Sequence, residues 1–327
     1  MTHFSVGVDL GGTSIKAALV KEGEGIVEFR KADTNAHEGP EHVIDTIADL
    51  IKELTTFSPV GAIAGIGIGA PGAVNWERDT VNNPPNLDGW DVVNLRRALH
   101  IRLGTDMPII VENDANVAGL GSAHYGAGLP YSSFILVTLG TGVGGVIIYQ
   151  NKIFRGSTGG AGEIGHMTID YEGPIDHAGV SGSIEAYIGQ RYLSRHARFK
   201  IRTRKNSLIH QLTKGHLKKI TPKILHEAAV AGDKAAIEVL AWAGHKLGCV
   251  LGSAINLLDI RKIIVGGGVS AAGDFILKPA EEAMHQFVMP GLKDGIEIIR
   301  ETLGNEAGML GAAHLVFEYL DEHSYST

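Results

Sequence analysis

The chain has little of three features that would point to other functions. It has 327 residues but a single cysteine, Cys249, which excludes an intramolecular disulfide and a cysteine-based metal site. Its formal net charge is -7, which argues against general nucleic-acid binding because that function favours a basic surface. The N-terminus lacks a basic stretch followed by an apolar run, and no unbroken apolar segment is long enough to span a bilayer. We therefore expect a cytoplasmic protein that binds neither membranes nor nucleic acid.

Glycine, by contrast, is abundant: the chain has 44 glycines, many in clusters between apolar runs. Hydrophobic residues make up 44% of the chain, enough for a substantial core. The length predicts two domains, since single cores stop growing near ~250–300 residues. Apolar runs typical of strands alternate with runs of helical spacing, and one of the predicted helices covers Val92 to Leu103. This alternation predicts a mixed α/β fold.

A strand–turn–strand pattern occurs twice. It joins the apolar segments 4–10 and 15–20, and again the segments 134–139 and 146–149. Both turns are made of glycines and a threonine: Gly11, Gly12 and Thr13, then Gly140, Thr141 and Gly142. Such turns can aim backbone N–H groups at an anion, although a glycine pair is more often an ordinary tight turn. The repetition indicates an internal duplication and favours a phosphate chain gripped by two hairpins, with Asp9 placed to hold a metal-bound water.

Asp114 lies where an apolar strand at 108–111 gives way to a helical run at 115–124. Asn or Asp at such a junction caps the helix and contributes ~1 kcal/mol, which is a strong structural explanation for Asn113 and Asp114. The functional interpretation is a carboxylate at the carboxyl end of a strand, where α/β sheets bind their ligands. Such a carboxylate could accept the proton of a hydroxyl that attacks phosphorus.

Two further groups have both a functional and a structural interpretation. Glu163 and His166 lie three residues apart in a glycine-rich loop. They are either a pair that binds a hydroxyl group or ordinary surface residues. Glu185 lies in the first turn of a predicted helix, where a carboxylate also favours the helix dipole. The segment from Gln190 to Lys223 is rich in Arg and Lys, which predicts a solvated surface, with a polyanion contact as the minor alternative.

The order of these motifs resembles that of the ROK family (repressor, open reading frame, kinase), and more closely its glucokinase-like sugar kinases. The resemblance covers nearly the whole chain. Residues 8–13 resemble the first phosphate motif of the family, 112–116 its catalytic motif and 139–145 its second phosphate motif. Residues 162–166 resemble the sugar-binding end of the family signature. Several motifs in the family's order are far more specific than any one of them.

The resemblance implies an actin-like, ribonuclease-H-like ATPase fold, with two α/β domains and an active-site cleft between them. We place a smaller N-terminal domain at 1–114, on which a final helix at 306–327 packs, and a larger domain at 115–305. It also implies a homodimer whose substrates are ATP and a small-molecule sugar.

The resemblance further implies the roles of individual residues. Asp114 would be the catalytic base. The sugar would be bound by Gly72, Asn113, Asp114, Glu163, His166 and Glu185. ATP would be bound by Asp9, Gly11, Gly12, Thr13, Lys16, Gly140, Thr141, Gly142, Gly144, Gly267 and Gly268. Mg²⁺ would be held through the ATP phosphates, with Asp9 nearby.

These roles together predict ATP-dependent phosphorylation of a hexose at its 6-hydroxyl, with glucose as the expected sugar. An N-acetylhexosamine kinase is the alternative within the enzyme class, and polyphosphate is an alternative phosphate donor. A sugar-responsive transcriptional regulator is the alternative of another class. Regulators of this family carry an N-terminal helix-turn-helix domain, and we expect none here because the first phosphate strand is predicted to start at Phe4.

The chain departs from the family pattern in one loop. Family members commonly bind structural zinc through three cysteines and the His of the Glu-x-Gly-His motif. The three cysteine positions are here Asp176, Ala178 and Ser183. Because zinc prefers closed sets rich in Cys and His, we predict no structural zinc in this loop. Packing and hydrogen bonds must then hold it in place.

Overall fold

A computed structural model describes residues 3–59, 61–84 and 86–324. The chain divides into two compact units. The first unit comprises Met1–Ser132, Ile147–Ala161 and Leu303–Thr327, and the second comprises Ser133–Val146 and Gly162–Thr302. The first unit thus continues beyond residue 114 and takes in a segment from the middle of the chain. No helix in the described ranges is both long and apolar enough to cross a membrane.

The first unit is built on a five-stranded sheet with the order β3-β2-β1-β4-β8. Its strands are β1 (Phe4–Leu10), β2 (Ser14–Lys21), β3 (Gly25–Asp33), β4 (Ile63–Ala70) and β8 (Ile109–Asn113). The first three form an antiparallel meander, whereas β4 pairs in parallel with both β1 and β8. The carboxyl ends of β1, β4 and β8 therefore lie at one edge of this sheet.

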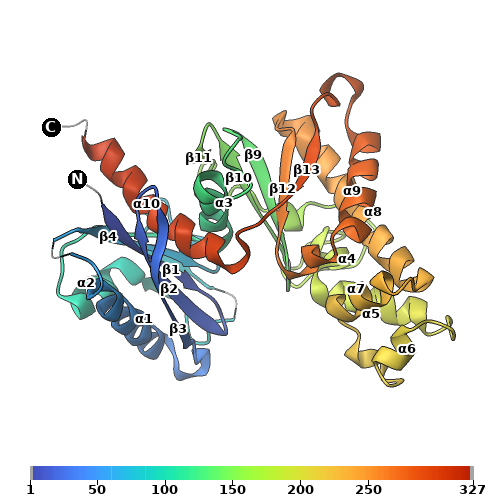
Figure 1. The fold of residues 1–327 in the computed structure, drawn as a ribbon, viewed down its shortest axis with the longest axis horizontal. Coiled ribbons are helices and arrows are strands. Elements are labelled where there is room, and N and C mark those ends of the chain that lie inside the picture. Colours follow the sequence, from blue (N-terminus) through green and yellow to red (C-terminus); the bar gives the residue numbers. More distant parts are fainter. Residues whose placement is uncertain (1–2, 60, 85, 325–327) are drawn as a thin grey trace. The chain divides into compact units, whose positions relative to one another are not determined.

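The two faces of this sheet follow the alternation of side chains along β1. Val6, Val8 and Leu10 are fully buried in a core shared with helix α1 (Pro40–Thr55), beside which lies α2 (Leu95–Leu103). The opposite face carries Ser5 and Gly7, which contact helix α10 (Ala307–Ser324). Figure 1 shows α1 and α10 on the two sides of these strands.

Glycines let α10 approach this face closely. A Cβ atom at Gly7 would lie 1.9 Å from the carbonyl oxygen of Met309, and one at Gly67 would lie 1.6 Å from that of Ala312. Helix α3 (Asp114–Tyr125) packs on α10 in the same way, since a Cβ atom at Gly311 would lie 1.7 Å from the carbonyl oxygen of Val117. The backbone of α10 is therefore in direct contact with both the sheet and α3.

Three short strands form a separate small sheet: β5 (Ala73–Val74), β6 (Thr80–Asn82) and β7 (Val92–Asn94). Our prediction of one helix from Val92 to Leu103 was wrong over its first three residues. They pair with β6, and the helix begins at Leu95 because the Asn94 side chain caps it by accepting a hydrogen bond from Arg97 N.

A second five-stranded sheet has the order β11-β10-β9-β12-β13. Its strands are β9 (Phe134–Leu139), β10 (Val143–Tyr149), β11 (Lys152–Ile153), β12 (Lys262–Gly266) and β13 (Glu297–Arg300). β12 runs parallel to both β9 and β13, and β10 and β11 are antiparallel. If β9 is matched to β1, then β10 corresponds to β2, β11 to β3, β12 to β4 and β13 to β8. The two sheets therefore have the same strand order. The duplication that the two hairpins indicated is therefore present in the fold.

The helices of the second unit pack around α8 (Lys234–Leu258) and α9 (Asp274–Phe287). Gly244, Gly248 and Gly252 recur every four residues on α8, and a Cβ atom at Gly248 would lie 2.2 Å from the carbonyl oxygen of Ala280 on α9. The shorter helices are α4 (Glu185–Ile188), α5 (Gln190–Ile201), α6 (Ile209–Leu212) and α7 (Pro222–Val230). Short 3₁₀ turns occur at Ala36–Glu38, Ile164–His166, Leu217–Lys219, Gly268–Ala272, Pro290–Leu292 and Gly304–Glu306.

Candidate functional site

Asn113 and Asp114 form the junction between β8 and α3. The Asn113 side-chain oxygen accepts hydrogen bonds from Ala115 N at 2.9 Å and from Asn116 N at 3.3 Å, so Asn113 caps the helix. Its amide nitrogen donates to the carbonyl oxygen of Gly72 at 3.0 Å, which ties the turn after β4 to this junction. Asp114 is exposed at the first position of the helix, where the helix dipole favours a carboxylate. The junction thus presents a carboxylate to solvent on a fixed backbone.

A buried ionic cluster, which the sequence did not reveal, lies directly beneath this junction. Glu112 is fully buried, and Nε of Arg78 and Nε of Arg155 each lie 2.9 Å from its Oε2 atom. Its Oε1 atom accepts hydrogen bonds from Asn113 N and from the Asn116 side chain, both at 2.9 Å. Removing one member of such a cluster leaves an uncompensated buried charge. Through its hydrogen bonds to Asn113 and Asn116, Glu112 fixes the backbone around Asp114.

The first hairpin turn carries an ion pair at its base. Asp9 and Lys16 are directly opposite in the β1–β2 register, and Lys16 Nζ lies 3.1 Å from Asp9 Oδ2. Gly11 N donates to Ser14 O to close the turn, and Thr34 Oγ1 donates to Gly11 O at 2.6 Å. Packing also favours glycine at position 12, because a Cβ atom there would lie 2.8 Å from the Cβ atom of Asn86.

The second hairpin turn is bound to Glu185. Val143 N donates to Glu185 Oε2 at 2.9 Å, and a Cβ atom at Gly142 would lie 2.2 Å from the same oxygen. A side chain at Gly142 would therefore displace this carboxylate. The space beside Gly140 is open, since a Cβ atom there would meet no atom within 4 Å. Thr141, the middle residue of the turn, is exposed.

Glu185 is a buried carboxylate whose second oxygen, Oε1, lies against His177. Its side chain is 6% exposed, and its Oε1 atom has no hydrogen-bond partner among the described residues. His177 Nδ1 lies 2.5 Å from that oxygen but is not aligned for a hydrogen bond. Buried polar atoms are normally hydrogen-bonded, so a donor from outside the chain would suit this oxygen.

Asp176 fixes the loop that carries Glu163 and His166. His166 Nδ1 lies 2.8 Å from Asp176 Oδ2, which also accepts from Ser183 Oγ at 2.6 Å. Asp176 Oδ1 accepts from the backbone N–H groups of Ala178 and Val180, both at 2.9 Å. The loop is therefore held by hydrogen bonds, through residues at two of the three family cysteine positions. Exposed Glu163 lies beside the other His166 nitrogen, with Oε2 4.0 Å from Nε2.

These hydrogen bonds set the ionisation of Asp176. Burial by itself would raise the pKa of its carboxyl. The hydrogen bonds from Ser183, His166 and Val180 outweigh burial and lower the pKa to about 2. Asp176 is thus an anion throughout the physiological range, and it orients the His166 ring with Nε2 turned away from it.

The remaining predicted glycines have different surroundings. Gly72 and Gly267 take positive φ values of 87° and 86°, and a Cβ atom at Gly267 would lie 2.4 Å from Leu139 O. Gly268 has open space around it, and Gly144 lies within β10. Both Gly267 and Gly268 follow β12, at the carboxyl end of that strand.

The predicted residues divide between the two units. Gly72, Asn113 and Asp114 belong to the first unit together with Asp9, Lys16 and the first hairpin turn. Glu163, His166 and Glu185 belong to the second unit together with the second hairpin turn, Gly144, Gly267 and Gly268.

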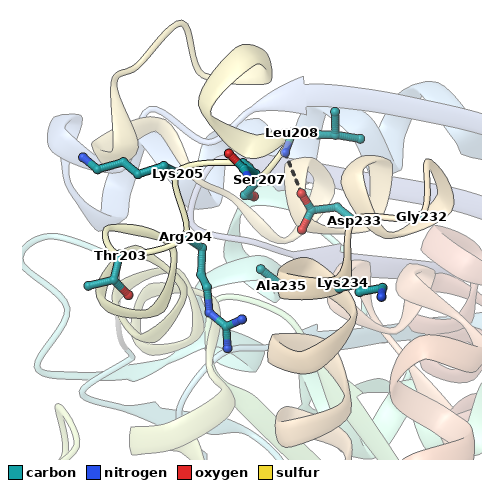
Figure 2. Close-up of a pocket in the computed structure, with 10 residues that line it drawn as sticks. Thr203, Arg204, Lys205, Ser207, Leu208, Gly232, Asp233, Lys234 and Ala235 are labelled. Carbon is teal, nitrogen blue, oxygen red and sulfur yellow. Dashed lines mark hydrogen bonds between the residues drawn. The ribbon is translucent and has the colours of Figure 1, made fainter.

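A separate pocket of about 600 Å³ lies in the second unit, where the predicted basic segment meets the start of α8 (Figure 2). None of the predicted site residues lines it. Its charges are already partly matched: Arg204 pairs with Glu238 at 3.0 Å, and Asp233 accepts a hydrogen bond from Leu208 N at 2.5 Å. This part of the basic segment thus forms a charged surface in which Arg204 already has an acidic partner.

Two sheets of identical strand order, each begun by a glycine-turn hairpin, define the class of protein: this is the predicted actin-like, ribonuclease-H-like ATPase fold. The chain belongs to the ROK family, whose model matches residues 5–318.

Known relatives match along almost the entire chain. A glucokinase of Halalkalibacterium halodurans is 36% identical over 95% of this chain and 94% of its own. A glucokinase of Thermotoga maritima is 32% identical over 96% of this chain and 97% of its own. The crystal structure of a ROK family glucokinase from Streptomyces griseus, in complex with glucose and AMPPNP, superposes with a TM-score of 0.82. It is 34% identical and covers 96% of this chain and 99% of that one.

Proposed function

We propose that this protein is a cytoplasmic, ATP-dependent glucokinase that transfers the γ-phosphoryl group of ATP to the 6-hydroxyl of glucose. The glucokinases among its relatives, matched over nearly their full lengths, support the substrate and the reaction. The glucose and AMPPNP bound to the similar Streptomyces griseus enzyme support the same pair of ligands. The observation that carries the proposal is the exposed Asp114 carboxylate on the junction fixed by Asn113 and Glu112.

Asp114 acts as the general base in this proposal. Phosphoryl transfer requires positioning and charge stabilisation more than covalent chemistry, and the nucleophile must be oriented and deprotonated. An exposed carboxylate at the start of α3 can accept the 6-hydroxyl proton. Asn113, tied to the Gly72 turn, helps to hold the sugar beside it.

The sugar ring hydroxyls are bound by Glu163, His166 and Glu185. Carboxylates are strong acceptors of hydroxyl hydrogen bonds. A sugar hydroxyl could donate to Glu185 Oε1, which is buried beside His177 without an aligned hydrogen bond from the described residues. His166 is suited to a second hydroxyl because Asp176 takes its Nδ1 atom and orients its Nε2 atom.

The nucleotide is bound by the hairpin turns and by the glycines after β12. Open space at Gly140 and Gly268 would let a phosphate or a nucleoside approach the backbone. Lys16, paired with Asp9, supplies a positive charge for the phosphates. Further members of this set are Gly11, Gly12, Thr13, Thr141, Gly142, Gly144 and Gly267.

Mg²⁺ fits this arrangement through Asp9. The ion keeps several waters and binds few protein carboxylates, so a single half-buried carboxylate beside the phosphates is sufficient. When bound, Mg²⁺ neutralises charge on the triphosphate. Asp9 would hold one of its waters.

The substrate is tested by measuring ADP release from ATP and Mg²⁺ with glucose, mannose, fructose, N-acetylglucosamine and N-acetylmannosamine. We expect the highest kcat/KM with glucose, and glucose 6-phosphate as the product. A preference for an N-acetylhexosamine would overturn the sugar assignment and leave the kinase assignment intact. Turnover with polyphosphate and none with ATP would overturn the assignment of ATP as the phosphate donor.

A further inference from the structure

Three potential metal ligands lie together on helices α3 and α10 of the first unit. They are His124 near the end of α3 and His314 and Glu318 on α10. One ligand atom from each side chain lies within 4.8 Å of the other two. His314 and Glu318 are four residues apart and therefore share one face of their helix. All three side chains are partly buried, so an ion could reach them from solvent.

The imidazole rings of His124 and His314 stack on each other, so one ring must tilt before both can bind the same ion. The ring centroids of His124 and His314 lie 3.5 Å apart, and the rings are inclined by only 22°. His124 Nε2 is buried and has no hydrogen-bond partner in the described part of the chain. His314 Nδ1 lies 3.4 Å from the Tyr125 hydroxyl, so Nε2 is the nitrogen left to bind an ion.

The charges around the cluster are compatible with a bound cation. Arg78, Lys152, Glu112 and Glu322 all lie near enough to Glu318 to act on it electrostatically. Each cation already has an anionic partner: Arg78 pairs with Glu112 at 2.9 Å and Lys152 with Glu322 at 2.6 Å. The two cations therefore do not neutralise Glu318 on their own.

The backbones that carry these ligands are closely packed. Cβ atoms at Gly121 and Gly311 would lie 2.1 Å from Ala307 O and 1.7 Å from Val117 O. These contacts fix α3 against α10 and keep the three side chains facing one another. Zinc binds histidine nitrogen and carboxylate oxygen at about 2.0–2.2 Å, so tetrahedral ligand atoms are about 3.3 Å apart. Rotation of the side chains, with the stacked rings tilting apart, can provide that spacing.

We propose that His124, His314 and Glu318 bind a first-row transition-metal ion, with Zn²⁺ as the expected occupant and water in the fourth position. Two imidazoles and one carboxylate are a donor set that suits Zn²⁺. The ion would link α3 to α10 and stabilise the folded first unit. None of the three ligands belongs to the residues assigned to glucose or ATP, so this proposal does not depend on the proposed kinase activity.

The test uses the full-length protein after treatment with a chelator, titrated with Zn²⁺ alone and, separately, with Co²⁺ as a spectroscopic probe. The wild type should bind one ion per chain, with a saturable rise in Tm and a visible Co²⁺ absorption band. Glu318→Gln keeps the shape of its side chain, and His314→Gln removes a nitrogen ligand. Each should weaken Zn²⁺ binding at least about tenfold. The matched control is His285→Gln, which removes an exposed histidine of α9 and should bind Zn²⁺ like the wild type.

Three outcomes would overturn the proposal. The first is no uptake of either ion by the wild type, in which case the stacked histidines have only a packing role. The second is equal uptake by Glu318→Gln and the wild type, which would place the ion elsewhere. The third is equal loss of binding in His285→Gln. Circular dichroism of each variant shows that it is folded before it is titrated, and Glu318→Gln alone suffices if His314→Gln does not fold.

Discussion

Asp176 shows how one buried side chain can organise a loop. Its two oxygens accept four hydrogen bonds, from His166, Ser183, Ala178 and Val180. Because two of these partners are side chains of the loop itself, Asp176 links the start of the loop to its end. The position of His166 thus depends on a carboxylate that does not itself contact the sugar in our proposal.

Asp176→Asn should therefore weaken both stability and sugar binding. An amide presents an N–H group where two donors now point, so at least one hydrogen bond to a charged acceptor is lost. We expect the free energy of unfolding to fall by about 2–3 kcal/mol. The KM for glucose should rise roughly tenfold, while ATP binding changes little. Ser183→Ala, which removes one donor, should have a smaller effect of about 1 kcal/mol. Unchanged glucose KM in a folded Asp176→Asn variant would contradict the positioning role.

The pH dependence of stability gives a second test of the same residue. Although burial opposes it, hydrogen bonding lowers the pKa of folded Asp176 to about 2, below the ordinary value of 3.8. A lowered pKa contributes stability that is fully present above the unfolded pKa and is lost as pH falls towards 2. The difference in unfolding free energy between wild type and Asp176→Asn should therefore narrow by about 2 kcal/mol between pH 5 and pH 2. Urea unfolding at a series of pH values measures it, and a constant difference would contradict the assignment.

At the residue scale, the sequence predicted the place of Asp114 and the capping role of Asn113, because a strand-to-helix junction is visible in the local pattern. It did not predict Glu112 as the centre of an ionic cluster. Arg78 and Arg155 are far from Glu112 in the sequence, and only the folded chain brings these three charges together. Their separations in the sequence match no helix or strand periodicity that would have predicted this contact.

At the element scale, α10 lies directly on the sheet because the strands beneath it carry glycines. Gly67→Ala would bring a methyl group within 1.6 Å of Ala312 O, so the helix must shift. We expect a loss of about 3 kcal/mol in the free energy of unfolding. The control is Gly160→Ala, where an added Cβ atom meets no atom within 4 Å and φ is not positive. Chemical denaturation of both variants measures the difference. Equal stability of the two variants would contradict the close packing of α10.

The spacing of hydrophobic residues predicted most helices and strands. It gave wrong boundaries where a capping side chain or a glycine decides where a helix begins or ends. The first hairpin follows its apolar pattern closely, whereas the second strand of the second hairpin begins at Val143, three residues before the predicted start. Val92 and Val93 fit a helical spacing, but the cap at Asn94 starts the helix later and leaves these residues to pair with β6. Helix α4 has only four residues, because Gly189 ends it and α5 begins at Gln190.

At the scale of the whole molecule, the duplication was visible in the sequence because both hairpins kept the same kind of turn. The membership of residues 147–161 in the first unit was not visible. Arg155 in this segment is buried against Glu112 and donates to the carbonyl oxygens of Asn75 and Trp76. These contacts join segments that are remote in sequence, which is why a single boundary at residue 114 did not describe the unit.

The family resemblance implies a homodimer, and sedimentation of the purified protein tests this prediction. We expect a mass twice that of the chain at micromolar concentration, unchanged by glucose. A species with the mass of one chain across the whole concentration range would contradict the dimer and leave the proposed reaction unaffected.

The most direct test of the proposed reaction is Asp114→Asn, assayed for glucose phosphorylation and, by calorimetry, for glucose binding. Loss of the general base should lower kcat by roughly 10²–10⁴-fold, while the Kd for glucose stays within a few-fold of the wild-type value. Asp274→Asn makes the same change at the first position of α9 and should leave both quantities unchanged. Near-normal turnover in Asp114→Asn would contradict the role of Asp114 as the general base.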